Sequence, residues 1–277
     1  MKFVSSVDIV LDLIKRIKQQ KKGYLTNFFL DIPKFEFWIS LKLLEYEEIG
    51  ETVFLFRKKQ GFNSLFFITT DVSALSRDID LLHNQHINDL FVIDLIGQHN
   101  YISDIKNILE DKGFYNYTSL VRMSKTINNY DLDETRFNYL SHADKSKGDE
   151  VYFLLQKYFD PYAEQLPLIE EIYKWTDNNG IIIYSDDSHT IQGFLIFELI
   201  GQTSYLRYWF VHPDHREKKI GSTLLRSFFA AGKDSKRQLF WVIRSNENAI
   251  KRYEHYGFKK EELFDYVMIN KNICYEG

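Results

Sequence analysis

The sequence predicts a mixed α/β fold, and three observations support this prediction. Apolar runs of strand length alternate along the chain with segments whose apolar residues recur at helical spacing. Hydrophobic residues make up 44% of the 277 residues and aromatic residues 16%, enough to form sizeable cores. Only 4 prolines and 13 glycines interrupt the chain, unlike the composition of a disordered protein. We therefore expect helices packed on a mixed sheet.

The first half of the chain is expected to contain four helices and four strands. Helical periodicity over residues 6–21 places Val7, Val10, Leu11, Ile14 and Ile17 on one face. The other predicted helices cover 34–47, 72–82 and 102–109, the last of them ending at Gly113, and the predicted strands cover 52–57, 64–69, 90–96 and 119–124.

The second half continues the same alternation after a polar segment. Residues 126–136 lack periodicity, which is typical of a surface connection, so we place two domains at 1–130 and 131–277. In the second domain, helices are expected at 148–159, 166–177, 222–231 and 248–256, and strands at 181–185, 190–200, 205–211, 238–243 and 266–269.

Charge and cysteine content exclude several classes of protein. A net charge of −4 and a pI near 6.1 provide no general attraction to nucleic acid or anionic lipid. The single cysteine, Cys274, excludes an internal disulfide and a thiolate metal cluster. Asp8 and Asp12 interrupt the first apolar run, and no run of about 18 apolar residues occurs, so neither a signal peptide nor a membrane span is expected. We expect a cytoplasmic protein, monomeric or homodimeric, with no nucleic-acid or membrane partner.

A basic loop joins the strand at 205–211 to the helix that follows it. The loop reads HREKKIGS, and such an order of strand, basic loop and helix is typical of phosphate binding. Backbone N–H groups at the start of a helix have no intrahelical acceptor, and Gly221 would allow a phosphate to approach them. Arg216, Lys218 and Lys219 add positive charge, and Ser222 is expected to cap the helix or contact a phosphate. The alternative is a solvated basic helix start.

A second motif, NENAIKRYEHYGF, follows at residues 246–258. Asn246, Ala249, Tyr253 and Gly257 are spaced by three and four residues, so they share one helix face that can line a cleft. The alternative interpretation makes Asn246 a helix N-cap and Tyr253 a core aromatic residue.

These two motifs together resemble the GNAT superfamily of acetyl-CoA-dependent N-acetyltransferases, over roughly residues 137–270. Arg216 and Gly221 match the family's acyl-CoA loop, whereas Lys219 stands where the first glycine of that loop usually lies. The resemblance implies that acetyl-CoA binds along Phe210, Val211, Arg216, Lys218, Lys219, Ile220, Gly221, Ser222, Asn246, Ala249 and Tyr253. It also implies transfer of an acetyl group to a primary amine.

Catalysis in this family needs an oxyanion donor, an acid and a base. The resemblance implies a backbone N–H near Val211 for the thioester carbonyl and Tyr253 as the general acid for the CoA sulfur. A tyrosine suits that role, since its ordinary pKa near 10 keeps it protonated. Many relatives carry a carboxylate that acts as the general base on the strand at 205–211, where this chain has Arg207. We predict Glu198 as a substitute base; the alternatives are a salt bridge from Glu198 to Arg207 or a chain of water molecules.

The acceptor and metal predictions concern the same strand and the turn after it. Arg207 and Trp209 alternate onto one face and are expected to bind the acceptor, with Arg207 holding an acceptor carboxylate. No metal is expected, because His212 and His215 lack an accompanying acidic cluster at ligand spacing.

The first half shows a weaker internal similarity to the second. In both halves, a strand and a helix are followed by Gly-Phe and a further strand. One interpretation is a tandem arrangement with a degenerate first unit. The alternative is that a glycine ends a helix before an apolar strand in both halves by chance. No basic glycine-containing loop lies between Ile68 and Leu90, so the first half is not expected to bind CoA. Two other functions stay open: a CoA-binding or partner-binding module without turnover, and aminoacyl transfer in peptidoglycan or tRNA-dependent chemistry.

Overall fold

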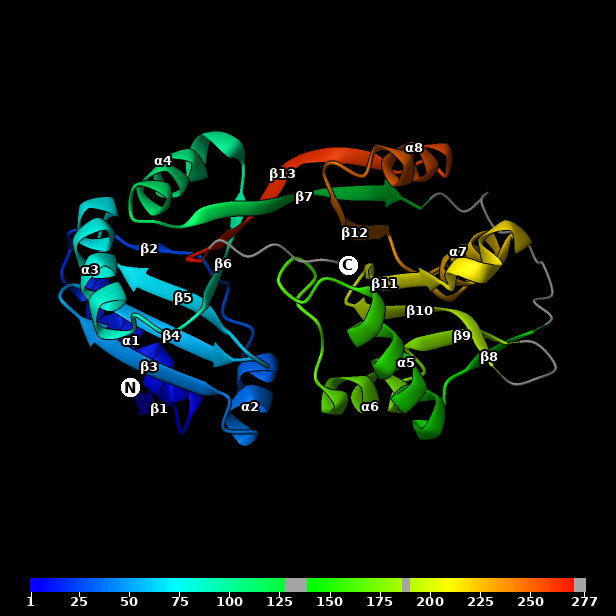
Figure 1. Ribbon diagram of the computed structural model, residues 1–277, viewed down its shortest axis with the longest axis horizontal. Helices are drawn as coiled ribbons and strands as arrows, with labels where there is room; N and C mark the ends of the chain where they lie inside the picture. The colour runs from blue at the N-terminus through cyan, green and yellow to red at the C-terminus, as the bar shows by residue number, and fades with distance from the viewer. Residues whose placement is uncertain (128–138, 186–189, 272–277) are drawn as a thin grey trace. The chain divides into compact units, whose positions relative to one another are not determined.

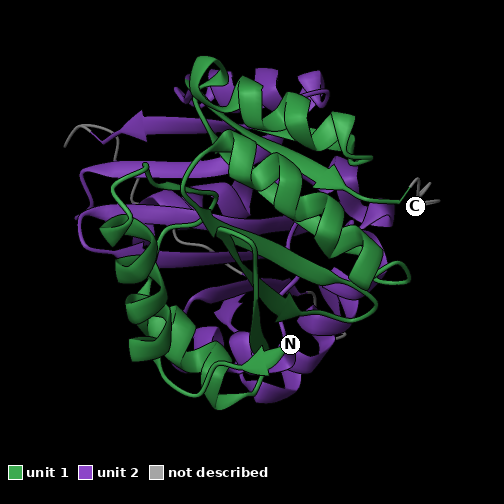
Figure 2. Cartoon of the chain, turned by 90° about the vertical axis from the view of Figure 1, so that its left-hand side faces the viewer, with its two compact units in different colours: residues 1–120, 262–274 green, residues 121–261, 275–277 purple. Residues whose placement is uncertain are grey.

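The structure, a computed structural model, describes residues 1–127, 139–185 and 190–271, and its contacts divide the chain into two compact units. Among the described residues, unit 1 comprises 1–120 and 262–271, and unit 2 comprises 121–261 (Figure 2). The predicted boundary after residue 130, and Cys274, lie outside the described residues. A single division of the chain is predicted from the sequence, whereas in the structure the last strand returns to unit 1.

Unit 1 is a mixed sheet covered by helices on both faces (Figure 1). Its strand order is β1-β3-β4-β5-β6-β13, with β2 paired to β5. The strands are β1 (Lys2–Phe3), β2 (Leu25–Thr26), β3 (Leu44–Ile49), β4 (Thr52–Lys58), β5 (Asn63–Thr69), β6 (Phe91–Gly97) and β13 (Lys259–Ile269); β7 (Tyr115–Thr126) begins in this unit. Only the β5–β6 pair is parallel among the registers recorded in this unit.

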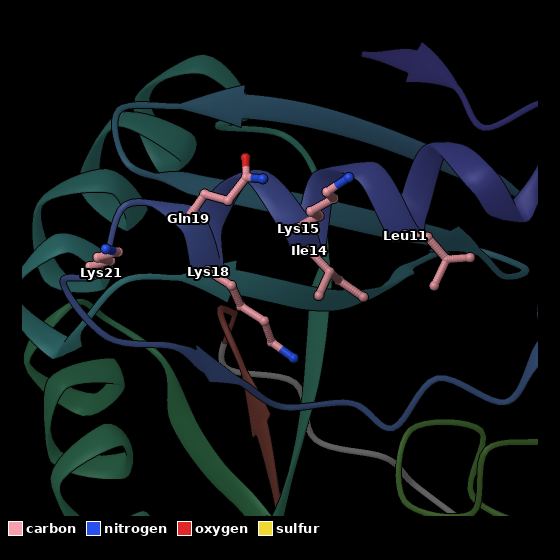
Figure 3. Close-up of a pocket in the computed structure, with 6 residues that line it drawn as sticks. All are labelled: Leu11, Ile14, Lys15, Lys18, Gln19 and Lys21. Atoms are coloured by element: carbon pink, nitrogen blue, oxygen red, sulfur yellow. The ribbon is translucent and has the colours of Figure 1, made fainter.

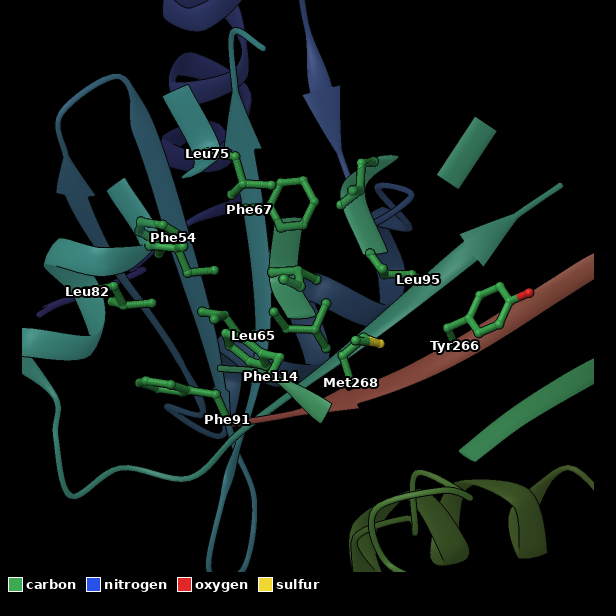
Figure 4. Packing of buried hydrophobic residues seen from close by; sticks show 14 of the residues in the cluster. Phe54, Leu65, Phe67, Leu75, Leu82, Phe91, Leu95, Phe114, Tyr266 and Met268 are labelled. Atoms are coloured by element: carbon green, nitrogen blue, oxygen red, sulfur yellow. The ribbon is translucent and has the colours of Figure 1, made fainter. Parts of the chain in front are cut away.

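Four helices bury the two faces of this sheet. Helices α3 (Val72–Gln85) and α4 (His99–Asp111) cover one core, in which Phe67, Phe91 and Met268 are fully buried (Figure 4). Helices α1 (Val7–Gln19) and α2 (Ile32–Ser40) cover the other face. Burying a large apolar side chain contributes about 1.5–3 kcal/mol, so each face supplies substantial stabilisation.

The predicted helix at 34–47 is wrong in its second part. Helix α2 ends at Ser40, Lys42 adopts a left-handed conformation (φ 56°), and the chain then forms β3. Pairing of β3 with β4 stabilises an extended segment whose leucines also fit a helical spacing. The two-residue strands β1 and β2 were not predicted, because they are too short to show an alternating pattern.

Unit 2 contains strands in the order β7-β12-β11-β10-β9-β8, with both parallel and antiparallel pairs. Its strands beyond β7 are β8 (Leu140–His142), β9 (Ile181–Ser185), β10 (Ile191–Ile200), β11 (Thr203–Val211) and β12 (Arg237–Ile243). Helices α5 (Lys145–Tyr158) and α6 (Ile169–Asp177) pack on Phe194, Tyr208 and Phe210 of the sheet. Helix α7 (Ile220–Ala231) packs on the opposite face, where Ile220 and Leu224 approach Gly193. Helix α8 (Glu247–His255) follows β12.

Within the described residues, no helix is long and apolar enough to cross a membrane.

Two aspartates lie buried beside each other in unit 1. Asp265 of β13 and Asp94 of β6 are each 6% exposed and belong to paired strands. Burial, and then the charge of Asp94, raise the pKa of Asp265 well above 3.8. A carboxyl whose pKa is higher in the folded than in the unfolded state lowers the free energy of unfolding. This loss is absent below the pKa of the unfolded state and grows as the pH rises towards the pKa of the folded state.

We therefore expect Asp265→Asn to stabilise the protein at neutral pH. The amide carries no charge and takes up no proton, so it removes the cost of a buried carboxyl whose pKa is raised on folding, and each kcal/mol gained raises Tm by about 2–4 °C. Thermal unfolding followed from pH 3 to pH 8 should show a gain at pH 7 that vanishes near pH 3, whereas the exposed Asp104→Asn control should show none. A gain independent of pH would contradict this account.

Candidate functional site

The two parallel strands at the centre of unit 2 separate from each other along their length. Pairing between β11 and β12 is recorded only at Thr203–Arg237, Ser204–Gln238 and Tyr205–Leu239. Among the described residues, no strand pairs with this edge of β11 beyond Tyr205. The edge from Leu206 to Val211 therefore presents backbone groups that an extended ligand can pair with.

Helix α7 starts beside the open end of these strands. Its N-cap position is held by Lys219, in a left-handed conformation (φ 60°), and no side chain caps the helix. Of the two roles expected for Ser222, that of N-cap is therefore wrong, because the helix begins earlier, at Ile220. The first N–H groups have no acceptor within the helix and lie at its positive end, so they form an anion-binding arrangement.

The conformation of Lys219 explains its unusual place in the loop. A left-handed backbone favours glycine and costs another residue about 1 kcal/mol or more, which accounts for a glycine at this position in a typical loop. Here lysine adopts the same conformation and adds an exposed ammonium group. The positive charges of Arg216 and Lys218 are exposed in the preceding 3-10 helix, Pro213–Lys218.

Gly221 is required by packing against β11. A Cβ atom at this position would lie 3.0 Å from Cζ2 of Trp209 and 3.4 Å from Cγ2 of Val211. Glycine therefore lets the start of α7 lie directly against the strand. Ser222 is tied to α8 instead, because its hydroxyl accepts a hydrogen bond from Tyr256 Oη at 3.0 Å.

Tyr253 of α8 lies between the two separating strands. Its ring centroid is 5.6 Å from that of Trp209 on β11 and 4.3 Å from that of Phe240 on β12. Burial raises the pKa of Tyr253 to about 12; Arg252 opposes this rise, and the charge of Glu164 adds to it. The phenol is therefore protonated at neutral pH and has a proton to donate.

Asn246 and Ala249, which were also predicted to bind the cofactor, stabilise the start of α8. Asn246 is the N-cap of the helix, and its Oδ1 accepts a hydrogen bond from the N–H of Ala249 at 3.1 Å. This is the structural role that the sequence analysis gave as the alternative. Among the described residues, the side-chain amide nitrogen of Asn246 has no hydrogen-bond partner.

Glu198 and Arg207 form an ion pair with each other. Arg207 also stacks on Tyr205, with its guanidinium carbon 3.9 Å from the ring centroid. The salt bridge that the sequence analysis gave as an alternative is thus present. Glu198 pairs with Tyr205, four residues before Trp209, so it lies about 13 Å along the strand from Trp209.

Trp209 and Phe210 point to opposite faces of β11. Trp209 contacts both Gly221 and Tyr253, and its indole N–H is buried without a hydrogen-bond partner among the described residues. Phe210 packs in the core against Phe159 and Phe194, so only its backbone faces the opening. An orphaned donor beside the opening fits a ligand that carries a carbonyl group.

Glu164, which the sequence did not mark as a candidate, lies in the loop between α5 and α6. Burial raises the pKa of this carboxyl to about 7, while a hydrogen bond from Asp160 N–H to Oε2 (3.2 Å) lowers it and the charge of Asp160 raises it. Tyr208 Oη fixes the loop, because its one proton is shared between the carbonyl oxygens of Glu164 (3.0 Å) and Gln165 (3.2 Å). No periodicity or motif marks a single glutamate in such a loop, so its sequence carries no signal.

Unit 1 contains a comparable separation of strands, but its own chain fills it. Pairing of β5 with β6 is recorded only at Asn63–Phe91 and Ser64–Val92, after which β2 pairs with β5 instead. The Asn27 side chain accepts from Phe67 N–H (2.8 Å) and donates to Leu65 O (3.1 Å) and Asp94 O (3.3 Å), so it bridges β5 and β6. At the start of α3, the acid Asp71 caps the helix by accepting from Ala74 N–H.

Two further features lie apart from this site. A shallow groove runs along the outer side of α1 (Figure 3) and is lined by Leu11, Ile14, Lys15, Lys18, Gln19 and Lys21, which include no carboxyl or imidazole group. In the part of the chain that the structure describes, no three His, Cys, Asp or Glu side chains are grouped so as to hold a metal ion. His212 contacts Tyr158 Oη through Nε2 at 3.1 Å.

Unit 2 thus belongs to the class of α/β domains in which a parallel strand pair opens beside a basic helix start. Residues 148–258 match the profile of the Acetyltransferase (GNAT) family, so the chain contains a GNAT acetyltransferase domain over these residues. This match lies within the region of the predicted resemblance, which is confirmed. Members of this family typically use acyl-CoA.

Solved structures with the same fold cover most of the chain. A GCN5-related N-acetyltransferase from Sphaerobacter thermophilus aligns with a TM-score of 0.58 and 10% identity, over 79% of this chain and 80% of that one. An acetyltransferase of the GNAT family from Colwellia psychrerythraea aligns with a TM-score of 0.52 and 11% identity, over 97% and 98%. A tandem GNAT protein from the clavulanic acid biosynthesis pathway aligns with a TM-score of 0.52 and 9% identity, over 80% and 78%.

These similarities support the predicted α/β fold, including its tandem form. No curated protein matches the sequence.

Proposed function

We propose that this protein transfers an acetyl group from acetyl-CoA to a primary amine of a small molecule, amino acid or peptide. The observation that carries the proposal is the position of Tyr253, a protonated phenol that lies between β11 and β12 in a GNAT domain. A proton donor at this point can protonate the leaving sulfur of a thioester.

The residues of unit 2 suit the parts of acetyl-CoA. The exposed Arg216, Lys218 and Lys219, with the N–H groups that start α7, would hold the pyrophosphate. The free edge of β11 would pair with the amide groups of the pantetheine arm, assisted by the indole N–H of Trp209. Acetyl-CoA supplies the activated acyl group. The backbone N–H of Val211, at the end of β11, would bind the thioester carbonyl.

A coupled assay with a panel of amines tests the proposed function. The protein is expected to release CoA thiol from acetyl-CoA only when an accepted amine is present, and mass spectrometry should show the amine heavier by one acetyl group. The second candidate is a CoA-binding module without turnover; lysine at the loop position Lys219 and the ion pairing of Glu198 favour it. Tight binding of acetyl-CoA without transfer to any amine of the panel would support that candidate.

Acetyl-CoA is expected to bind once per chain. In unit 1, Asn27 occupies the separation between β5 and β6, and Asp71 places a negative charge at the start of α3, where a phosphate would be repelled. Isothermal titration calorimetry should therefore give one site per chain, and Lys219→Glu should weaken that site. Two sites of similar affinity would show that unit 1 also binds the cosubstrate.

A further inference from the structure

A β-bulge interrupts β11 at Arg207. Ile196 of β10 pairs with Tyr208. The next residue of β10, Phe197, pairs with Leu206, so Arg207 is an extra residue between the two pairs. An extra residue breaks the regular alternation of side chains between the two faces of a strand. Spacing along β11 therefore does not decide which face Arg207 occupies, and its contacts must do so.

These contacts place Arg207 on the face of the sheet opposite α7. Phe197 packs against Phe228 of α7, with 6.0 Å between ring centroids. The next residue of β10, Glu198, therefore points to the other face. Arg207 forms its ion pair with Glu198 and so lies on that face too. Trp209 contacts the start of α7, so the expectation that Arg207 and Trp209 share one face is wrong.

The guanidinium of Arg207 is held in place while most of its donors stay unused. Its Nε donates to Oε2 of Glu198, and its central carbon lies 3.9 Å from the ring centroid of Tyr205. Among the described residues, the terminal nitrogens of Arg207 and Oε1 of Glu198 have no hydrogen-bond partner. Both side chains are partly exposed, at 29% and 27%, so a ligand can reach them. Terminal arginine N–H groups suit a carboxylate, and a carboxylate oxygen suits an N–H donor.

Strand geometry separates this ion pair from the point of acetyl transfer. Val211, whose N–H the proposed function assigns to the thioester carbonyl, lies four residues beyond Arg207, or about 13 Å along β11. Contact with Tyr205, which lies farther from Val211, keeps the guanidinium from reaching towards the opening. On the other face, the rings of Trp209 and Tyr253 contact each other, with centroids 5.6 Å apart. We therefore expect the acceptor to approach from the face that carries Arg207.

We propose that the ion pair of Arg207 with Glu198 binds the carboxylate of acceptors whose amine and carboxylate lie on the order of 13 Å apart. This role rests on the proposed function and narrows its acceptor class. An extended peptide advances about 3.3–3.6 Å per residue, so a peptide of four residues with a free C-terminal carboxylate has the required length. Its last N–H groups can donate to Oε1 of Glu198. A free α-amino acid is too short, because its nitrogen and carboxyl carbon lie about 2.5 Å apart.

The test measures kcat/KM for alanine peptides of one to six residues, each as the free acid and as the C-terminal amide. The ratio of acid to amide should be about 1 for alanine itself and should rise to about 10–100 at four residues. In the double variant Glu198→Gln, Arg207→Met, which leaves neither charge unpaired, this ratio should fall to about 1 at every length through a higher KM for the acid. The control Arg226→Met, at an exposed arginine of α7, should keep the wild-type ratios.

A second variant and three outcomes separate this role from a structural one and from the proposed function. Arg207→Lys keeps the charge but not the fork of donors, so its ratio should be intermediate. Equal losses for acid and amide in the double variant would overturn the carboxylate role, since the ion pair would then serve the fold or the chemistry. A wild type that acetylates other amines without preferring long peptide acids would overturn this role and leave the proposed function standing. A wild type that binds acetyl-CoA but acetylates no amine would overturn the proposed function, and this role with it.

Discussion

The Tyr253→Phe variant is expected to transfer acetyl groups about 10²–10³ times more slowly than the wild type, while binding acetyl-CoA with similar affinity. The phenol, which lies between β11 and β12, is the proton donor of the proposed reaction, and its hydroxyl is the only group that phenylalanine lacks. The ring contacts with Trp209 and Phe240 remain, so the variant should keep its fold.

Steady-state kinetics with a saturating amine measures this effect. Loss should fall on kcat rather than on KM for acetyl-CoA, since the proton is needed at the sulfur as the C–S bond breaks. The matched control is Tyr139→Phe, at a tyrosine that is 58% exposed in the same unit. Equal kcat values for Tyr253→Phe and wild type would remove Tyr253 from the mechanism.

Reversing two charges before α7 should weaken acetyl-CoA binding about 100-fold, or about 2.7 kcal/mol. In the double variant Arg216→Glu, Lys218→Glu, two exposed cations beside the helix start become anions that repel the phosphates. Each charge-assisted hydrogen bond contributes about 1.5–3 kcal/mol, and exposure to solvent reduces this contribution.

Calorimetry at two salt concentrations measures the change. Wild-type affinity should fall as salt rises, and the variant should show a much flatter dependence, because screening acts on the charges that were removed. The control Lys233→Glu, Lys236→Glu changes the same net charge beyond the other end of α7. Equal weakening in both variants would mean that net charge, not the helix start, determines binding.

Elements with strong local patterns were predicted well from the sequence. The strand at 181–185 and the helix at 222–231 agree with β9 and α7 to within two residues, because buried alternation and helical spacing are visible locally. The last strand was predicted only at 266–269, whereas β13 begins at Lys259. Its first residues are charged, and pairing with neighbouring strands rather than their own composition makes them extended.

The parts of the candidate site likewise differ in whether a local sequence pattern or the tertiary fold determines them. The loop around Gly221 and the helix of Tyr253 are each continuous in sequence, so their motifs and the family resemblance predicted them. Glu164 acquires its raised pKa from burial in the folded unit, and a sequence does not display tertiary burial. For Glu198, alternation along β10 suited both a base and an ion pair, and only the folded register shows Arg207 beside it.

The return of β13 to unit 1 determines the order in which the chain can fold during synthesis. Phe264 pairs with Gly97, so completing this sheet needs a contact that spans most of the chain. On the ribosome, residues 121–261 are all available before the strand that completes unit 1 has emerged. Until then, the edge of β6 is open to pairing with other chains, and chaperone protection at this stage would lower the risk of aggregation.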